Sequence, residues 1–140
     1  MKFLIYKFIA IIFLLLLLSG CVNYVKINGK KINVEVADTD KERTVGLMFR
    51  ERLDENSGML FVYNDSRVRN FWMANMQFTL DMIFINESKS IVKIEYAGLC
   101  ENKVCNIHSS DIPSMYVLEV NANFSEENNI KTGDLVSINI

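Results

Sequence analysis

Hydrophobic and polar residues alternate in short segments along most of the chain, separated by turns rich in Asn, Asp, Ser and Gly. A period of two predicts β-strands that turn one face toward a core. We expect about seven strands, at residues 24–27, 31–36, 59–63, 80–85, 91–96, 115–121 and 135–138. The pair Asn28-Gly29 favours a hairpin between the first two strands, because it accepts the positive φ of a tight turn.

Helical signals are few. The sequence Thr39-Asp40-Lys41-Glu42 fits a capping box, which predicts that a short helix begins there. A second short helix is expected at residues 124–129, and Ser57-Gly58 is expected to form a turn before the third strand. Many short strands with two short helices indicate a mainly β (α+β) domain, built as a small antiparallel barrel-like or rolled sheet.

Residues 69–85 hold the only Trp of the chain and an isolated carboxylate, Asp81, among hydrophobic neighbours. Both faces of the predicted strand 80–85 are hydrophobic except at Asp81, which is typical of a central strand covered on both sides. A buried carboxylate is costly unless it is paired, so we expect a partner for it among Arg50, Arg69 and Asn75. The carboxylate either forms a structural pair or turn cap, or it belongs to a ligand-binding or catalytic site.

The N-terminus has the pattern of an export signal. Two lysines, Lys2 and Lys7, precede a hydrophobic run at residues 8–18 that is shorter than the ~20 residues of a membrane span. The run ends in Leu18-Ser19-Gly20-Cys21, which resembles the lipobox of bacterial lipoproteins, and this implies acylation of Cys21. We therefore expect a signal peptide at 1–20, an acylated tether with the first hairpin strand at 21–30, and one β-rich domain at 31–140.

The charge balance bears on the partners. Without Lys2 and Lys7 the chain has 13 basic and 17 acidic residues, a net charge of −4. Nucleic-acid-binding domains carry a basic face, so we expect no nucleic-acid partner. The expected partners are the membrane, through the lipid anchor, and a small molecule, a glycan or an envelope protein at the exported domain.

Six motifs stand in a fixed order along the mature chain: Val36-Ala37-Asp38-Thr39, Gly46-Leu47-Met48-Phe49-Arg50, Gly58-Met59-Leu60-Phe61, Phe71-Trp72-Met73-Ala74-Asn75-Met76, Leu80-Asp81-Met82-Ile83-Phe84-Ile85 and Tyr116-Val117-Leu118-Glu119-Val120-Asn121-Ala122. In order and spacing they resemble the family called domain of unknown function 192, over roughly residues 31–138. The resemblance implies a small β-rich domain, often exported or membrane-anchored, with no established biochemical role. The recurring polar residues of the family fall on the candidate ligand-binding residues Arg50, Trp72, Asn75, Asp81 and Glu119, and its cysteine pair falls on Cys100 and Cys105.

Cys100 and Cys105 are the only thiols left once Cys21 is acylated, and export would place them in an oxidising compartment. We expect a disulfide, which stabilises so short a loop by roughly 2 kcal/mol. A redox-active thiol pair is an alternative, although the usual spacing is Cys-x-x-Cys. A zinc site that adds His108 and Asp111 is a further alternative, although the spacing is irregular.

Methionine is abundant in the predicted domain, at positions 48, 59, 73, 76, 82 and 115. Thioethers select Cu(I), but most of these residues lie in hydrophobic runs, where Met fills gaps in a core. We expect core packing for them and for Trp72, with Trp72 beside Asn75 as a candidate for the mouth of a site.

Three functions follow from these residues. The first, a binding or envelope-associated module without cofactor, would hold its ligand in a cleft near Arg50, Trp72 and Asp81. The second, a hydrolase of envelope polymers, would use Asp81 and Glu119 as its two carboxyl groups. The third is the handling of copper or zinc by the methionines or by the cysteines with His108. The chain offers no nucleophile-base pair of known spacing and no phosphate loop, which favours a binding module over an enzyme.

Overall fold

The computed structural model describes residues 22–102 and 104–140, and the predicted signal peptide and Cys21 lie outside this part. The elements, in chain order, are β1 (Tyr24–Ile27), β2 (Lys30–Ala37), α2 (Asp40–Val45), β3 (Ser57–Arg67), β4 (Asn70–Phe71), β5 (Leu80–Ile85), β6 (Ile91–Ala97), β7 (His108–Ser109), β8 (Ser114–Asn121), α3 (Phe124–Glu127) and β9 (Val136–Asn139). The predicted mainly β class, with a rolled sheet and two short helices, is confirmed. None of the helices described is long and hydrophobic enough to cross a membrane.

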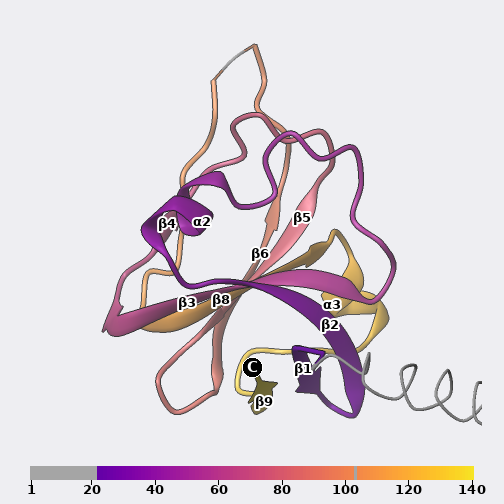
Figure 1. Ribbon diagram of the computed structural model, residues 1–140, viewed down its shortest axis with the longest axis vertical. Coiled ribbons are helices and arrows are strands. Elements are labelled where there is room, and N and C mark those ends of the chain that lie inside the picture. Colours follow the sequence, from indigo (N-terminus) through magenta and orange to yellow (C-terminus); the bar gives the residue numbers. More distant parts are fainter. Residues whose placement is uncertain (1–21, 103) are drawn as a thin grey trace, which may run out of the picture.

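Seven strands form one sheet in the order β6-β5-β8-β3-β2-β1-β9, and β4 pairs with β7 in a separate two-stranded sheet. The neighbours in the large sheet are antiparallel except for β2 and β3, which are parallel. The sheet curls into a half-barrel (Figure 1). Its two edges meet at one end, where Ser90 bridges Leu135 and the Ile91 amide donates to the Asp134 carbonyl over 3.0 Å.

The curled sheet has a hydrophobic cluster on each face, and β5 contributes to both. All six residues of β5 are buried, as expected of a central strand. Leu80, Met82 and Phe84 pack into the cluster on the side of α2, whereas Ile83 and Ile85 pack into the cluster on the side of α3. The two helices accordingly lie at opposite sides of the sheet (Figure 1).

The helix α2 begins with the predicted capping box. The Thr39 hydroxyl accepts from the Glu42 amide at 3.2 Å, and the Glu42 carboxylate accepts from the Thr39 amide at 3.1 Å. The helix ends at Gly46, whose φ of 49° turns the chain away. Leu47 then enters the core, and Met48 follows as a half-buried residue. The capping box thus fixes where the segment after α2 meets the sheet.

The predicted turn at Ser57-Gly58 is wrong, because both residues are the first of β3. Gly58 pairs with Val120 of β8, and a Cβ atom at Gly58 would lie only 2.6 Å from the Glu119 carbonyl oxygen. A glycine is needed here because the two backbones approach closely, and not because the chain reverses. The sequence pattern could not separate these two reasons.

Replacing Gly58 should therefore weaken the pairing of β3 with β8. We expect Gly58→Ala to lower the free energy of unfolding by about 1–3 kcal/mol, because the backbones must separate. Gly98→Ala is the matched control, since its Cβ would meet nothing closer than 3.7 Å. Urea denaturation of both variants tests this, and equal stability of the two would contradict the argument.

Candidate functional site

A cavity of about 250 Å³ opens on the side of the sheet covered by α2. Its walls come from α2 and the segment after it, from β3, from residues 70–76, and from one residue of β8. The lining residues are Arg43, Thr44, Val45, Gly46, Leu47, Met48, Phe61, Tyr63, Asn70, Phe71, Trp72, Met73, Met76 and Glu119. Half of these residues are aromatic or methionine, and the mixture of hydrophobic surface with a few polar groups is typical of sites for small ligands.

Glu119 is the one carboxylate among the lining residues. Glu119 lies on β8 opposite Met59 of β3 and Met82 of β5, and only 5% of its surface is exposed. Burial alone raises the pKa of Glu119 to about 8, and no described residue offers the carboxyl a hydrogen bond that would oppose this rise. Glu119 is therefore protonated at neutral pH and presents an unpaired carboxyl to the cavity.

Two arginines flank Tyr63 at the side of the cavity. The guanidinium of Arg69 lies 3.7 Å from the centre of the Tyr63 ring, and that of Arg43 lies 5.1 Å from it. Arg43 also donates to the Val62 carbonyl at 2.8 Å and pairs with Asp40 at 2.6 Å. Burial raises the pKa of Tyr63 more strongly than the two guanidinium groups lower it. The guanidinium groups of Arg43 and Arg69 are thus already paired with other groups of the protein.

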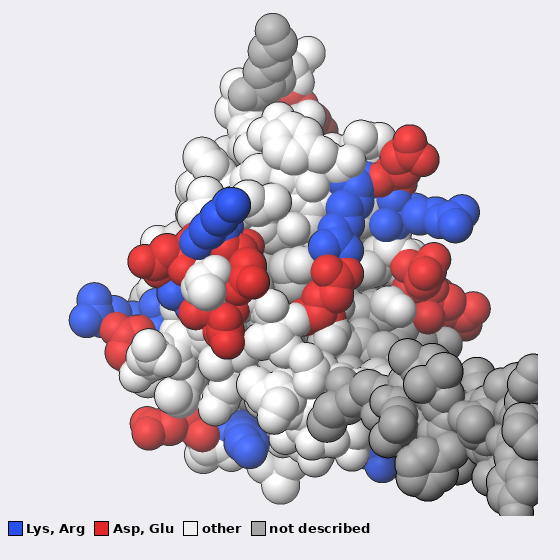
Figure 2. Space-filling view, viewed as in Figure 1, with Lys and Arg blue, Asp and Glu red and all other residues white. Residues whose placement is uncertain are grey.

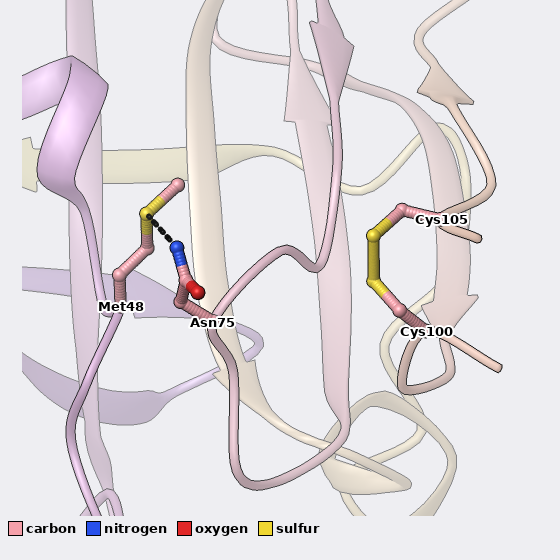
Figure 3. Close-up of a disulfide and its surroundings, with 4 residues drawn as sticks. All are labelled: Met48, Asn75, Cys100 and Cys105. Atoms are coloured by element: carbon pink, nitrogen blue, oxygen red, sulfur yellow. Dashed lines mark hydrogen bonds between the residues drawn. A yellow bond between two sulfur atoms is a disulfide. The ribbon is translucent and has the colours of Figure 1, made fainter. Parts of the chain in front are cut away.

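The mouth of the cavity is formed by two loops that are tied together through Asn75. The Phe49 amide donates to the Asn75 carbonyl at 2.9 Å, and the Asn75 side-chain nitrogen lies 3.9 Å from the Met48 sulfur (Figure 3). Trp72 lies on the second of these loops, lines the cavity and is 56% exposed. The prediction that Trp72 packs in the core is therefore wrong, and the alternative position at the mouth of a site agrees with the structure.

Asp81 is not part of this cavity. One of its oxygens accepts from the Asn123 amide at 3.1 Å and the other from the Ser125 amide at 2.9 Å, which caps the start of α3. Asn123 itself makes no capping bond with its side chain. The expected partners Arg50, Arg69 and Asn75 are wrong, and the alternative of a carboxylate that caps a turn is confirmed.

Asp81 and Glu119 point to opposite faces of the sheet. Glu119 is directly opposite Met82, and Asp81, the residue before Met82, has the other orientation. Their surroundings agree, because Met82 belongs to the cluster beside α2 and Ile83 to the cluster beside α3. The expected pair of carboxyl groups in one cleft is therefore wrong.

Arg50 does not line the cavity that contains Glu119. Its guanidinium bonds both oxygens of Glu35 on β2, and this hydrogen bond is the largest cause that lowers the pKa of the Glu35 carboxyl. The pair lines a second, more open hollow of about 400 Å³ beside α2. Of the five predicted binding residues, only Trp72 and Glu119 line the cavity. Asn75 does not line it, but contacts Met48, which does.

The cysteine pair forms the expected disulfide, with an S–S distance of 2.04 Å (Figure 3). His108 is buried against Glu95, with Nδ1 2.7 Å from Oε1, and Asp111 pairs with Lys93 at 2.8 Å. A zinc site at these residues is wrong, because each potential ligand has another partner. In the part of the chain that the structure describes, no three His, Cys, Asp or Glu residues are grouped as a metal site would require.

Sequence reasoning missed Arg43 and Tyr63 as lining residues. No pattern in the sequence marks them, since Arg43 lies on a predicted surface helix and Tyr63 is the last residue of a predicted strand. The sequence shows that methionine is abundant, but only the fold shows that Met48, Met73 and Met76 share one cavity.

Removing the Asp81 carboxylate should destabilise the fold. We expect Asp81→Ala to lower the free energy of unfolding by roughly 3 kcal/mol, because two buried amides lose a charged acceptor. Asp81→Asn retains one acceptor oxygen and should cost about half as much. The exposed Asp54 is the control, and Asp54→Ala should change stability by less than about 0.5 kcal/mol in urea denaturation. Unchanged stability of Asp81→Ala would refute the capping role.

The Glu119 carboxyl should make stability fall with rising pH. Between its ordinary value of 4.5 and about 8, the unfolded chain is ionised at this position and the folded chain still holds the proton. The free energy of unfolding should therefore decrease across this window, by up to roughly 4 kcal/mol relative to Glu119→Gln. Denaturation of both proteins at pH 5 and pH 9 measures the difference, and parallel pH profiles would contradict it.

With this geometry in view, comparison with known proteins gives the family. A protein from Sinorhizobium meliloti 1021, described as a candidate transcription regulator, has 31% identity and a TM-score of 0.76, with 86% of this chain and 96% of that chain covered. A protein of unknown function from Novosphingobium aromaticivorans has 30% identity and a TM-score of 0.75, with 86% and 88% covered. No curated protein matches the chain. The family model DUF192, described as "Uncharacterized ACR", matches residues 23–138, and the chain belongs to this family.

Proposed function

We propose that this protein is a lipid-anchored envelope module that binds a small ligand in the cavity above Glu119. The observation that carries the proposal is the unpaired carboxyl of Glu119, which is buried at the cavity and bonded to no described residue. A buried carboxyl without a partner costs stability, and a ligand that bonds it would recover that cost. The aromatic and methionine side chains of the lining supply hydrophobic surface around it.

The size and character of the cavity limit the ligand. A volume of about 250 Å³ is at the lower end of the range of small-molecule pockets, so it suits a small molecule or an ion. The Arg43 guanidinium at its edge is already paired, and Glu119 is the one carboxyl group in the lining, beside the neutral polar side chains of Thr44, Tyr63 and Asn70. Binding would depend on Glu119 for orientation and on Trp72 for coverage at the mouth.

A binding role is better supported than hydrolysis. Hydrolases with two carboxyl groups place both on one cleft, whereas Glu119 faces the cavity and Asp81 caps α3 on the other face. Glu119 would therefore act alone, without the second group that such a reaction requires.

The candidate regulatory role of the Sinorhizobium relative is not carried over to this chain. Acidic and basic side chains are interspersed on the face shown in Figure 2. This face therefore shows no basic patch of the kind that contacts nucleic-acid phosphates, and the net charge of −4 of residues 21–140 also disfavours a nucleic-acid partner.

The proposed location rests on the N-terminal sequence and on the disulfide. β1 begins at Tyr24, only three residues after Cys21, so an acylated Cys21 would hold the domain directly at a membrane surface. The disulfide between Cys100 and Cys105 agrees with an oxidising compartment outside the cytoplasm. Mass spectrometry of the protein from its membrane fraction, before and after Cys21→Ser, tests the anchor.

A thermal-shift screen tests binding at the cavity. The purified protein is mixed with small organic molecules that are neutral, cationic or anionic, and in a separate set with metal ions. A ligand of the cavity should raise the melting temperature, because it binds only the folded state. Glu119→Gln and Trp72→Ala should abolish the shift, while Tyr96→Ala, a substitution outside the lining, should retain it.

Two results would refute the proposed function. One is a wild-type protein that no compound in either set stabilises. The other is a set of shifts that Glu119→Gln and Trp72→Ala leave unchanged, since binding would then take place elsewhere on the molecule.

A further inference from the structure

We infer that the ligand of this cavity is a soft monovalent metal ion, Cu(I), bound by the thioethers of Met48, Met73 and Met76 with the Glu119 carboxylate as counter-charge. The inference rests on the proposed binding function and names its ligand class. It differs from the soft-metal site expected at the cysteines and His108, which are occupied by other partners.

The fold sorts the methionines into two groups. Met48, Met73 and Met76 line the cavity with Glu119. The other three methionines of the described chain do not line it: Met59 faces the hollow beside Arg50, Met82 is fully buried in β5, and Met115 lies in β8. Three of the six thus line the same cavity as the unpaired carboxyl, although they come from two separate loops.

Backbone and side-chain contacts hold these two loops in place. The Met76 amide donates to the Met73 carbonyl at 3.3 Å, which folds the second loop into a turn with both thioethers on it. Asn75, between them, accepts from the Phe49 amide and lies 3.9 Å from the Met48 sulfur, so it joins the first loop to this turn (Figure 3). These contacts fix the two loops that bring the three methionines to the cavity.

The donor atoms select the metal. Thioether sulfur is a soft, neutral ligand that prefers Cu(I), whereas Ca²⁺ and Mg²⁺ require several oxygen ligands and Zn²⁺ prefers thiolate or imidazole. The cavity lining contains no Cys and no His. Three thioethers give the low coordination number that a monovalent soft ion accepts, and Ag(I) should bind in the same way.

The charge of the site matches a single positive ion. Neutral thioethers cannot compensate the metal charge, and a buried ion needs a counter-ion. Glu119 supplies one negative charge when its proton leaves to solvent, so the occupied site is neutral. The aromatic rings of Phe71 and Trp72 in the lining can interact favourably with a cation.

Binding involves no change of oxidation state, because the metal enters and stays as Cu(I). The disulfide between Cys100 and Cys105 is not a ligand and lies in a different loop.

Competition with a colorimetric Cu(I) chelator in ascorbate buffer tests the inference. Ascorbate keeps the copper reduced, and the purified wild-type protein should withdraw one equivalent of Cu(I) from the chelator. We expect Met48→Leu, Met73→Leu and Met76→Leu each to weaken the affinity about tenfold or more, since each removes one ligand at nearly constant side-chain volume. Glu119→Gln should weaken it as well, because the counter-charge is lost.

Matched controls separate the cavity from the rest of the molecule. Met115→Leu removes a thioether away from the cavity and should bind like the wild type. Cys100→Ser with Cys105→Ser excludes copper capture by reduced thiols. Far-ultraviolet circular dichroism of every variant verifies that the fold is retained, and Ag(I) titration by calorimetry provides a second readout.

The outcomes are distinct. No withdrawal of Cu(I) by the folded wild-type protein, or cavity variants that bind as tightly as Met115→Leu, would overturn the copper inference. If organic molecules still stabilise the protein through Glu119 in the thermal-shift screen, the proposed binding function survives this failure. If neither organic molecules nor other metal ions stabilise the protein through Glu119, both ideas are refuted.

Discussion

Strands β5 and β8 are covered on both faces, and this double coverage governs what a carboxylate on either strand must do. Asp81 and Glu119 occupy neighbouring strands only one residue out of register with each other, yet they meet different surroundings. Asp81 receives two backbone amides from the start of α3 and so satisfies its burial. Glu119 receives none and is held protonated, with its carboxyl open to the cavity. One carboxylate supports the fold, and the other is available for a ligand.

This difference explains why the protein tolerates an unsatisfied group in its interior. A hydrophobic residue at position 119 would pack against Met59 and Met82 without a desolvation cost, so the carboxyl lowers stability at neutral and alkaline pH. Groups that lower stability are often found at sites of function, where a ligand provides the missing interaction. The backbone of the same residue fits tightly against Gly58, which fixes the position of Glu119 on the sheet.

The disulfide and the ion pairs around Lys93 have a separate role. Lys93 contacts Glu95 and Asp111, and Glu95 also contacts the buried His108, which fastens the long segment after β6 against the sheet. The disulfide links Cys100 to Cys105 within that segment and so restricts its conformations. These contacts explain the polar residues that had suggested a metal site, and they leave the cavity beside α2 as the place where hydrophobic walls and an unpaired polar group coincide.

The sequence by itself determined most elements of the large sheet and the two short helices, but not the short strands β4 and β7. Alternation, Asn28-Gly29 and the capping box at Thr39 act through neighbours in the chain, so the hairpins, the helix α2 and the buried strand β5 were predictable from local physics. Only the tertiary structure decided the site. The face to which a buried carboxylate points, and the amides that reach it, depend on register between distant strands, and so do the three methionines that meet at one cavity. Local patterns do not contain that register, which is why Asp81 and Glu119 looked alike until the sheet was assembled.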